Sequence, residues 1–373
     1  MAAGGGGFST AFDVSFDQAF DELPATAFGE GTPFGNPPPP PSPLVHVTRG
    51  DKIESLHYGH YAVAAPDGSI VEGSGDIHFV TYPRSALKPI QALQLITSGA
   101  ADAFGLGDIH LSLACSSHWA EPFHVDAVSA WLTDLSCTED DLICGRDYPY
   151  NEAAKEALLR QNVDRSRVFH NCSGKHAGFL TTCRHLSHDI EGYDEFDHPI
   201  QIRYREDLSL VTGVDAGSYS WGIDGCALPA PALPMVDVAR SMARLACPET
   251  LPAPEAAAIT RLSEAIAAAP EYFWGTAAPC SDLAQVTHGR IIAKIGAEGY
   301  MAAMIRDKGL GIAIKVSDGT RRAVTVALFG VLQKMGLLTD LEQTALKNHI
   351  MPSVLNSRGT IIGDLRPSPE TFG

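Results

Sequence analysis

The order of the predicted secondary structure narrows the choice of fold more than any other property of this sequence. Apolar alternation predicts strands near the start, at residues 45–48, 57–65, 69–72 and 78–82. Helical periodicity follows, at residues 86–98, 122–135, 152–161, 175–187, 200–212, 236–246 and 254–268. Strands return at residues 289–296, 299–306 and 310–317, before helices at 321–335 and 340–348. This order predicts an α+β fold in which both chain ends build one antiparallel sheet and a helical section is inserted between them.

A change of composition near residue 44 predicts where the folded part begins. Residues 1–43 hold a glycine run and a proline run among scattered acidic residues. Such a segment cannot bury enough apolar surface to offset its chain entropy, so we expect it to be disordered. Residues 44–373 are expected to form one domain, with sheet parts at about 44–82 and 288–373 and a helical part at about 83–287.

The excess of acidic residues limits the classes of partner. The chain has 44 Asp and Glu against 27 Lys and Arg, a formal net charge of −17. Phosphate backbones and anionic membrane surfaces repel this charge, so we expect neither nucleic acid nor a membrane as partner. No run approaches the roughly 18 uncharged apolar residues that a membrane span needs. A small neutral or zwitterionic molecule is the ligand class that remains.

Cysteine usage and the start of the sequence bear on the cellular compartment. The eight cysteines are spread along the chain rather than crowded together, which indicates reduced thiols. The first basic residue is Arg49, so the basic start of a secretory signal is not seen. Acidic residues before Arg49 also argue against a transit peptide. We therefore expect a cytoplasmic protein.

Ser85 and Lys88 form an S-x-x-K motif at the predicted start of a helix. A spacing of three places both side chains on one helical face, where the amine could take the hydroxyl proton. To act as a base, the lysine needs a pKa lowered from about 10.4 towards 7, which burial and a second cation can cause. The alternative is a serine cap followed by a solvent-facing lysine.

Two further positions carry chemistry of the same kind. Ser117 and His118 follow an apolar run that ends at Ala114, where side chains emerge from a strand or helix; a simple loop cap is the alternative. Lys294 stands inside the apolar run 291–296, where a charged amine is costly unless it is paired or neutral. An edge strand with this lysine facing water is the other interpretation.

Cys172, Lys175 and His176, with the distant Asp224 and Cys226, make a third group. Two thiolates are a normal beginning for a zinc site, but the usual spacing of four ligands in two pairs is missing. Two alternatives stay open. The cysteines are structural and buried, or Cys172 is a nucleophile with His176 as its base.

Taken together, these motifs resemble the L-asparaginases of class 3, the rhizobial inducible type or asparaginase II family. The resemblance runs from about residue 46 to about residue 363, and five blocks occur in order at compatible spacing. The blocks are Arg84 to Pro89, Cys115 to His118, Asn171 to His176, Trp221 to Cys226, and Ala293 to Gly296.

The resemblance implies a fold like that of serine β-lactamases and penicillin-binding proteins. It implies hydrolysis of L-asparagine to L-aspartate and ammonia through an acyl-enzyme, by a homodimeric protein. It also implies roles for individual residues. Ser85 with Lys88 and Ser117 with Lys294 would be two catalytic Ser-Lys pairs, and Cys172, Lys175 and Cys226 would bind a Zn²⁺ that aids substrate binding. As our own further expectation, the substrate-binding residues near this zinc are Arg84, His118, Asn171, His176 and Asp224, with Arg84 as the contact for a carboxylate.

Two rival functions belong to other classes. One is a penicillin-recognising hydrolase or another Ser-Lys amidase, although the K-T-G triad of β-lactamases is missing and Lys294 would take its part. The other is a zinc-stabilised binding protein without catalytic activity.

Overall fold

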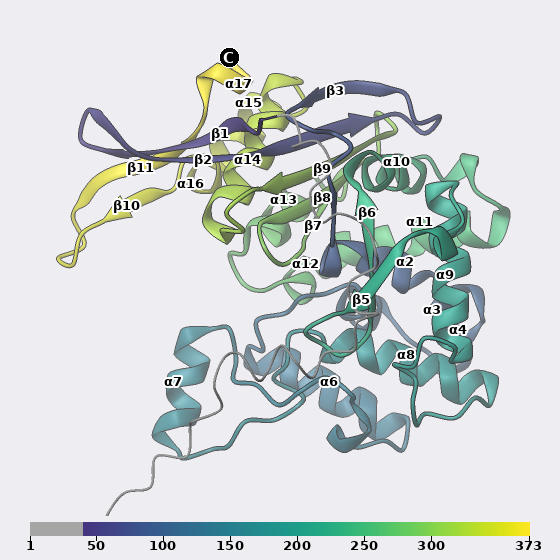
Figure 1. Cartoon of the computed structure of the whole chain (residues 1–373). Helices are drawn as coiled ribbons and strands as arrows, with labels where there is room; N and C mark the ends of the chain where they lie inside the picture. The colour runs from purple at the N-terminus through teal and green to yellow at the C-terminus, as the bar shows by residue number, and fades with distance from the viewer. Residues whose placement is uncertain (1–39) are drawn as a thin grey trace, which may run out of the picture. The chain divides into compact units, whose positions relative to one another are not determined.

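The computed structural model describes residues 40–373 (Figure 1). The predicted disorder of residues 1–43 therefore concerns a segment that lies almost wholly outside the described residues. The first strand, β1, spans Ser42–Arg49, so regular structure begins slightly before the predicted boundary.

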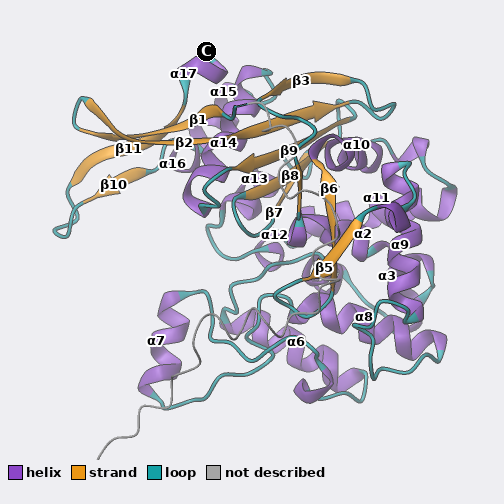
Figure 2. Cartoon of the chain, viewed as in Figure 1, coloured by secondary structure: helices purple, strands orange, loops and turns teal. Residues whose placement is uncertain are grey.

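One antiparallel sheet is built from both ends of the described chain (Figure 1; Figure 2). Its strands are β1, β2 (Lys52–Ala64), β3 (Ile70–Ser74), β7 (Ile291–Ile295), β8 (Tyr300–Ile305), β9 (Leu310–Val316), β10 (Ser353–Leu355) and β11 (Ile361–Pro367). The strand order is β10-β11-β1-β2-β9-β8-β7, and β3 pairs with the second half of β2. The pairing of β2 with β9 joins the two chain ends. This topology confirms the predicted α+β fold with a sheet from both ends.

Helices cover both faces of this sheet. Neighbouring side chains along a strand point to opposite faces. On one face, Tyr61 of β2 accepts a hydrogen bond from Lys334, the last residue of α14, at 3.3 Å. On the other face, Gly311 of β9 lies so close to α10 that a Cβ atom there would be 2.0 Å from the Ala239 carbonyl oxygen. α14 (Arg321–Lys334) and α10 (Met235–Ala246) therefore cover opposite faces.

β7, β8 and β9 are buried along almost their whole length, which explains why their sequences read as nearly unbroken apolar runs. Lys294 on β7 stands opposite Ala302 on β8, which stands opposite Ala313 on β9. Directly opposite residues point to the same face of a sheet. Ala313 shares its face with Gly311, so Lys294 points to the side of α10 and the helical section.

The helical section occupies most of the chain between the two halves of the sheet. Its helices are α2 (Lys88–Gln91), α3 (Leu93–Thr97), α4 (Ala100–Ala103), α5 (Asp108–Ala114), α6 (Pro122–Asp134), α7 (Glu152–Arg160), α8 (Ser173–Leu186), α9 (Pro199–Thr212), α10, α11 (Ala253–Ala268), α12 (Pro270–Phe273) and α13 (Pro279–Val286). A small sheet, in the order β4-β6-β5, accompanies them with strands β4 (Val80–Thr81), β5 (Ser220–Ile223) and β6 (Pro229–Pro234). Between β9 and β10 lie α14, α15 (Asp340–Ala345) and α16 (Lys347–Ile350), and α17 (Pro369–Phe372) follows β11. None of the helices that the structure describes is long and apolar enough to cross a membrane.

The helix predicted for residues 86–98 is present, but it is divided into short pieces and is not one continuous helix. A 3-10 turn at Arg84–Leu87 is followed by the short helices α2 and α3. Pro89 lacks the N–H that would bond to the Ser85 carbonyl in a continuous helix, and the Lys88 N–H takes that carbonyl instead. The chain therefore turns tightly where Ser85 and Lys88 lie.

Candidate active site

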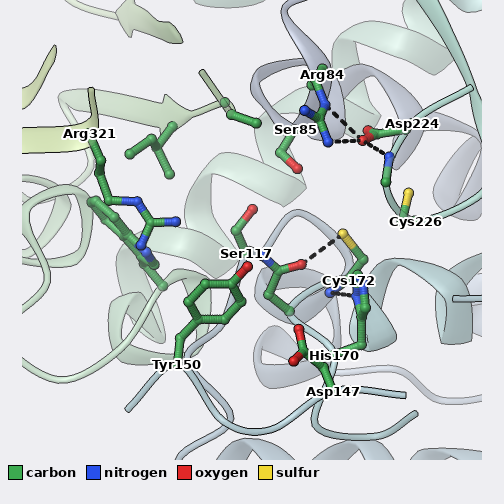
Figure 3. Close-up of a pocket in the computed structure, with 16 residues that line it drawn as sticks. Arg84, Ser85, Ser117, Asp147, Tyr150, His170, Cys172, Asp224, Cys226 and Arg321 are labelled. Carbon is green, nitrogen blue, oxygen red and sulfur yellow. Dashed lines mark hydrogen bonds and ion pairs between the residues drawn. The ribbon is translucent and has the colours of Figure 1, made fainter. Parts of the chain in front are cut away.

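A polar cavity of about 270 Å³ opens between the helical section and the end of β7 (Figure 3). Its wall includes residues from chain segments that are far apart in the sequence. Seven of the predicted site residues line it: Arg84, Ser85, Ser117, Asn171, Cys172, Asp224 and Cys226. Its size and polar wall suit a small polar ligand.

Ser117 lies between two buried lysine amines. Lys294 Nζ donates to Ser117 Oγ at 2.7 Å, and Lys88 Nζ donates to the same oxygen at 3.1 Å. The Lys88 amine also donates to the Ser116 carbonyl, and the Lys294 amine donates to the Ile295 carbonyl at 2.8 Å. Lys88 is fully buried and Lys294 is 3% exposed. The structure thus brings three of the four predicted catalytic residues into one hydrogen-bonded cluster.

The Lys294 amine has the environment of a base. Burial lowers the pKa of this amine well below its ordinary value, and the neighbouring Lys88 charge lowers it further. A neutral amine keeps a lone pair that can accept the Ser117 proton. β7 is an edge strand in the sheet order, yet all of its residues are buried. The alternative of a lysine that faces water is therefore excluded.

Ser85 lines the cavity, but its predicted contact with Lys88 is not formed within residues 40–373. The Lys88 amine donates instead to the Ser116 carbonyl and to the Ser117 hydroxyl. The spacing of residues near Lys88 in the sequence does not reveal these partners. Arg84, just before Ser85, has a φ of 52°, which is unusual for a residue with a side chain. Such strained backbone often occurs at functional sites, and here it precedes a serine on the cavity wall.

The two thiols and the amine that were predicted as metal ligands lie close together at the start of α8. Cys172 and Cys226 line the cavity, and Lys175 Nζ donates to Cys226 Sγ at 3.0 Å. The Cys226 thiol lowers the pKa of Cys172 well below its usual value, while the same contact and burial raise the pKa of Cys226. Burial opposes a charge on Lys175, but the sulfurs of Cys226 and Cys172 outweigh it and raise the amine's pKa.

These three donors fit a soft divalent cation. Two sulfurs and one nitrogen, once deprotonated, are donors that zinc prefers. The described residues hold no cluster of three His, Cys, Asp or Glu side chains that could bind a metal ion. A metal at this position would therefore depend on Lys175 as its third protein ligand.

His118 and His176 lie beneath the cavity rather than in its wall, and both are fully buried. His118 Nδ1 accepts from the Ala120 N–H at 3.1 Å, so Nε2 carries the proton and donates to Ser173 Oγ at 2.8 Å. His176 Nδ1 lies 2.6 Å from the Tyr193 hydroxyl. Burial lowers the pKa of both rings well below the usual value. Direct contact with a ligand in the cavity is not supported for either histidine.

Arg84 and Asp224 form an ion pair on the cavity wall (Figure 3). Arg84 Nε and Nη2 both approach Asp224 Oδ1, at 2.8 and 2.7 Å. Asn171 also lies on the wall, where its Oδ1 atom is 3.2 Å from Cys172 Sγ. These three predicted contacts therefore face the cavity, although the charges of Arg84 and Asp224 already satisfy each other.

Five polar or aromatic residues of the wall were not predicted from the sequence as site residues. No local motif marks them, because each lies in a loop or at a helix start that only the fold brings to the cavity. The one available signal is a polar or aromatic side chain beside a turn. The five are Asp147, Tyr150, His170, Trp274 and Arg321.

A serine hydroxyl that is hydrogen-bonded to a buried amine of lowered pKa, beside a small polar cavity, has the chemistry of a serine-dependent hydrolase. The family model described as L-asparaginase II matches residues 45–367. The chain therefore belongs to the L-asparaginase II family, and it is an asparaginase, an amidohydrolase.

Comparison with curated proteins gives no match. Among solved structures, the chain is similar to a β-lactamase from Mycobacterium bovis, with 14% identity, 74% of this chain and 94% of that chain covered, and a TM-score of 0.40.

Proposed function

We propose that this chain hydrolyses the side-chain amide of L-asparagine to give L-aspartate and ammonia, as a class 3 enzyme of the rhizobial inducible type. The observation that carries the proposal is the Ser117 hydroxyl, which lies 2.7 Å from the Lys294 amine and 3.1 Å from the Lys88 amine. Amide hydrolysis needs one group that takes a proton from the nucleophile and another that gives a proton to the leaving nitrogen. A cluster of one hydroxyl and two amines supplies both.

Ser85 is the proposed nucleophile. Its Oγ forms a bond to the amide carbon of the substrate while the Lys88 amine takes the hydroxyl proton. Ser117 gives its proton to the amide nitrogen, the carbon–nitrogen bond breaks, and ammonia leaves. Ser117 regains a proton from Lys88, to which it is hydrogen-bonded. An aspartyl ester on Ser85 remains, and Lys88 has returned the proton that it took.

Water then hydrolyses this ester. The Lys294 amine, whose pKa is lowered by burial, accepts a proton from the attacking water through Ser117. The oxygen of water bonds to the ester carbon, the bond from that carbon to Ser85 Oγ breaks, and the proton returns to Ser85. L-Aspartate leaves, and the cluster is restored.

The sulfur and amine cluster is proposed to bind one Zn²⁺ through Cys172, Lys175 and Cys226. When bound, the zinc would act as a Lewis acid that helps to hold the substrate. The three ligands must lose protons to bind a metal, so adding Zn²⁺ to metal-free protein should release protons. Cys172→Ser should weaken this binding strongly. Undiminished zinc affinity in Cys172→Ser would contradict the assignment.

The protein is further proposed to act in the cytoplasm as a homodimer. The spread of reduced cysteines supports the compartment, since all eight are free thiols in the structure. Light scattering on a sizing column would give twice the mass of one chain, 39.7 kDa, if the dimer is correct. A single-chain mass at micromolar concentration would refute it.

The substrate is tested by ammonia release from L-asparagine, L-glutamine and simple amides, with a chromogenic β-lactam in parallel. The proposal predicts ammonia from asparagine and no turnover of the β-lactam. Hydroxylamine added to the assay should divert part of the product to the aspartyl hydroxamate, because it competes with water for an acyl-enzyme. Turnover of the β-lactam without turnover of asparagine would favour the rival Ser-Lys hydrolase.

A further inference from the structure

The two arginines on the cavity wall differ in what they contact. Arg84 Nε and Nη2 both contact Asp224 Oδ1, at 2.8 and 2.7 Å. Within residues 40–373, by contrast, no hydrogen bond or ion pair involves the Arg321 side chain. Its Cζ atom lies 5.4 Å from the centre of the Tyr150 ring. Among the described residues, the five N–H donors of the Arg321 guanidinium thus have no protein acceptor and can bind a ligand.

Fold and stacking together aim this guanidinium at the cavity. Arg321 is the first residue of α14, and Tyr150 lies just before α7, so the pair joins the sheet side of the cavity to the helical side. Figure 3 shows both side chains on the same flank of the cavity, with the guanidinium turned towards it. Contact with an aromatic face holds a guanidinium while its N–H edges stay free.

The proposed substrate has a group that needs such a partner. Besides the amide that is cleaved, L-asparagine carries an α-carboxylate, and planar guanidinium groups bind carboxylates through two parallel hydrogen bonds. Arg84 is already neutralised by Asp224, and the Lys88 and Lys294 amines are hydrogen-bonded to Ser117. On the strength of the proposed function, we infer that Arg321 binds the α-carboxylate of the substrate and restricts the site to amides that carry one.

The next residue provides a matched control. Arg322 has the same charge and lies in the same first turn of α14, but its Nε donates to His57 Nε2 at 3.1 Å. It does not line the cavity. Both arginines are exposed, so replacing either by glutamine removes one surface charge without opening a core cavity.

The experiment measures kcat and KM for ammonia release from L-asparagine and from its α-methyl ester, which keeps the amide but masks the carboxylate. Arg321→Gln should raise KM for asparagine roughly tenfold and leave kcat within about twofold, since loss of a charge-assisted hydrogen bond at an exposed site affects binding. The same variant should leave the kinetics of the ester unchanged. Arg322→Gln should leave both substrates unchanged.

Each other outcome has a definite meaning. The inference is overturned if Arg321→Gln and Arg322→Gln have the same KM for asparagine. It is also overturned if Arg321→Gln raises KM for asparagine and for the ester by the same factor. In both cases the proposed function stands. If wild-type protein releases no ammonia from asparagine, the proposed function fails, and the inference fails with it.

Discussion

Lys294 lies on an apolar, buried strand, yet its amine forms hydrogen bonds in the candidate active site. Its strand is fully buried, and its amine contacts Ser117 and a backbone carbonyl rather than an acidic side chain. Desolvation lowers its pKa, so the folded protein disfavours the charged form that the unfolded chain prefers at neutral pH. A lysine kept in such a place costs stability, which indicates that its neutral amine has a chemical use.

Lys294→Met should distinguish a catalytic role of the amine from a role in the stability of the fold. The substitution keeps the volume and removes the buried amine, so we expect kcat to fall at least about 10²-fold and the melting temperature to stay the same or rise. Lys315→Met is the control, because Lys315 is also a buried lysine on a strand but donates to the Glu298 and Val316 carbonyls, at 2.6 and 2.8 Å. Steady-state kinetics and thermal unfolding give both readouts. Wild-type kcat in Lys294→Met, or an equal loss in Lys315→Met, would argue against the role.

The sequence alone indicated an unusual role for Lys294, but it did not indicate which residues contact the neighbouring Lys88. A lysine inside the apolar run 291–296 is visible as an anomaly in one dimension. The partner of Lys88 is not, because Ser117 lies 29 residues away and only the packing of α2 against the loop after α5 brings them together. The predicted contact of Lys88 with Ser85 depended on a regular helix, which Pro89 prevents.

At the scale of elements, α8 positions the sulfur and amine cluster. Cys172 precedes its first residue and Lys175 lies in its first turn. Gly174 lets the start of α8 approach α5, since a Cβ atom there would lie 2.6 Å from the Leu113 carbonyl oxygen. His118 adds a second tie by donating to Ser173 Oγ at 2.8 Å. The loop that carries Ser117 and the helix that carries Lys175 are thereby held together.

Two glycines of α8 give a test of this packing. Gly174→Ala should lower the free energy of unfolding by about 1–2 kcal/mol, since overpacking outweighs the better helix propensity of alanine. In Gly178→Ala the nearest atom would be Ala114 Cβ at 3.5 Å, an ordinary contact, so stability should rise by about 0.5–1 kcal/mol. Urea unfolding of both variants measures the difference. Equal stability of the two would show that α8 is not fixed by Gly174.

Helices and strands could be predicted from the sequence where the periodicity of apolar residues is strong. The helices α6, α9, α10 and α11 begin and end within about two residues of the predicted bounds. β6 was missed because three of its six residues are proline, which argues against a strand inside a sheet. β10 and β11 were missed because sheet pairing, β11 with β1 and β10 with β11, makes them strands rather than a strong alternating pattern.

At the scale of the whole molecule, the site depends on contacts between distant parts of the chain. Ser85 follows the first sheet segment, Ser117 and Cys172 come from the helical section, and Lys294 and Arg321 come from the last third. The order of strands and helices predicted that both ends meet in one sheet. It could not predict which loops close over the cavity, because Tyr150, Trp274 and Arg321 reach it only through tertiary packing.

The central claim is that asparagine is hydrolysed by Ser85 with the help of Ser117, while Cys172 serves binding. The most direct measurement is ammonia release from L-asparagine by wild type, Ser85→Ala, Ser117→Ala and Cys172→Ala, with folding checked by circular dichroism. The account predicts a loss of kcat of roughly 10³-fold or more in both serine variants and mainly a raised KM in the cysteine variant. Wild-type activity in either serine variant, or a complete loss of kcat in Cys172→Ala alone, would contradict it.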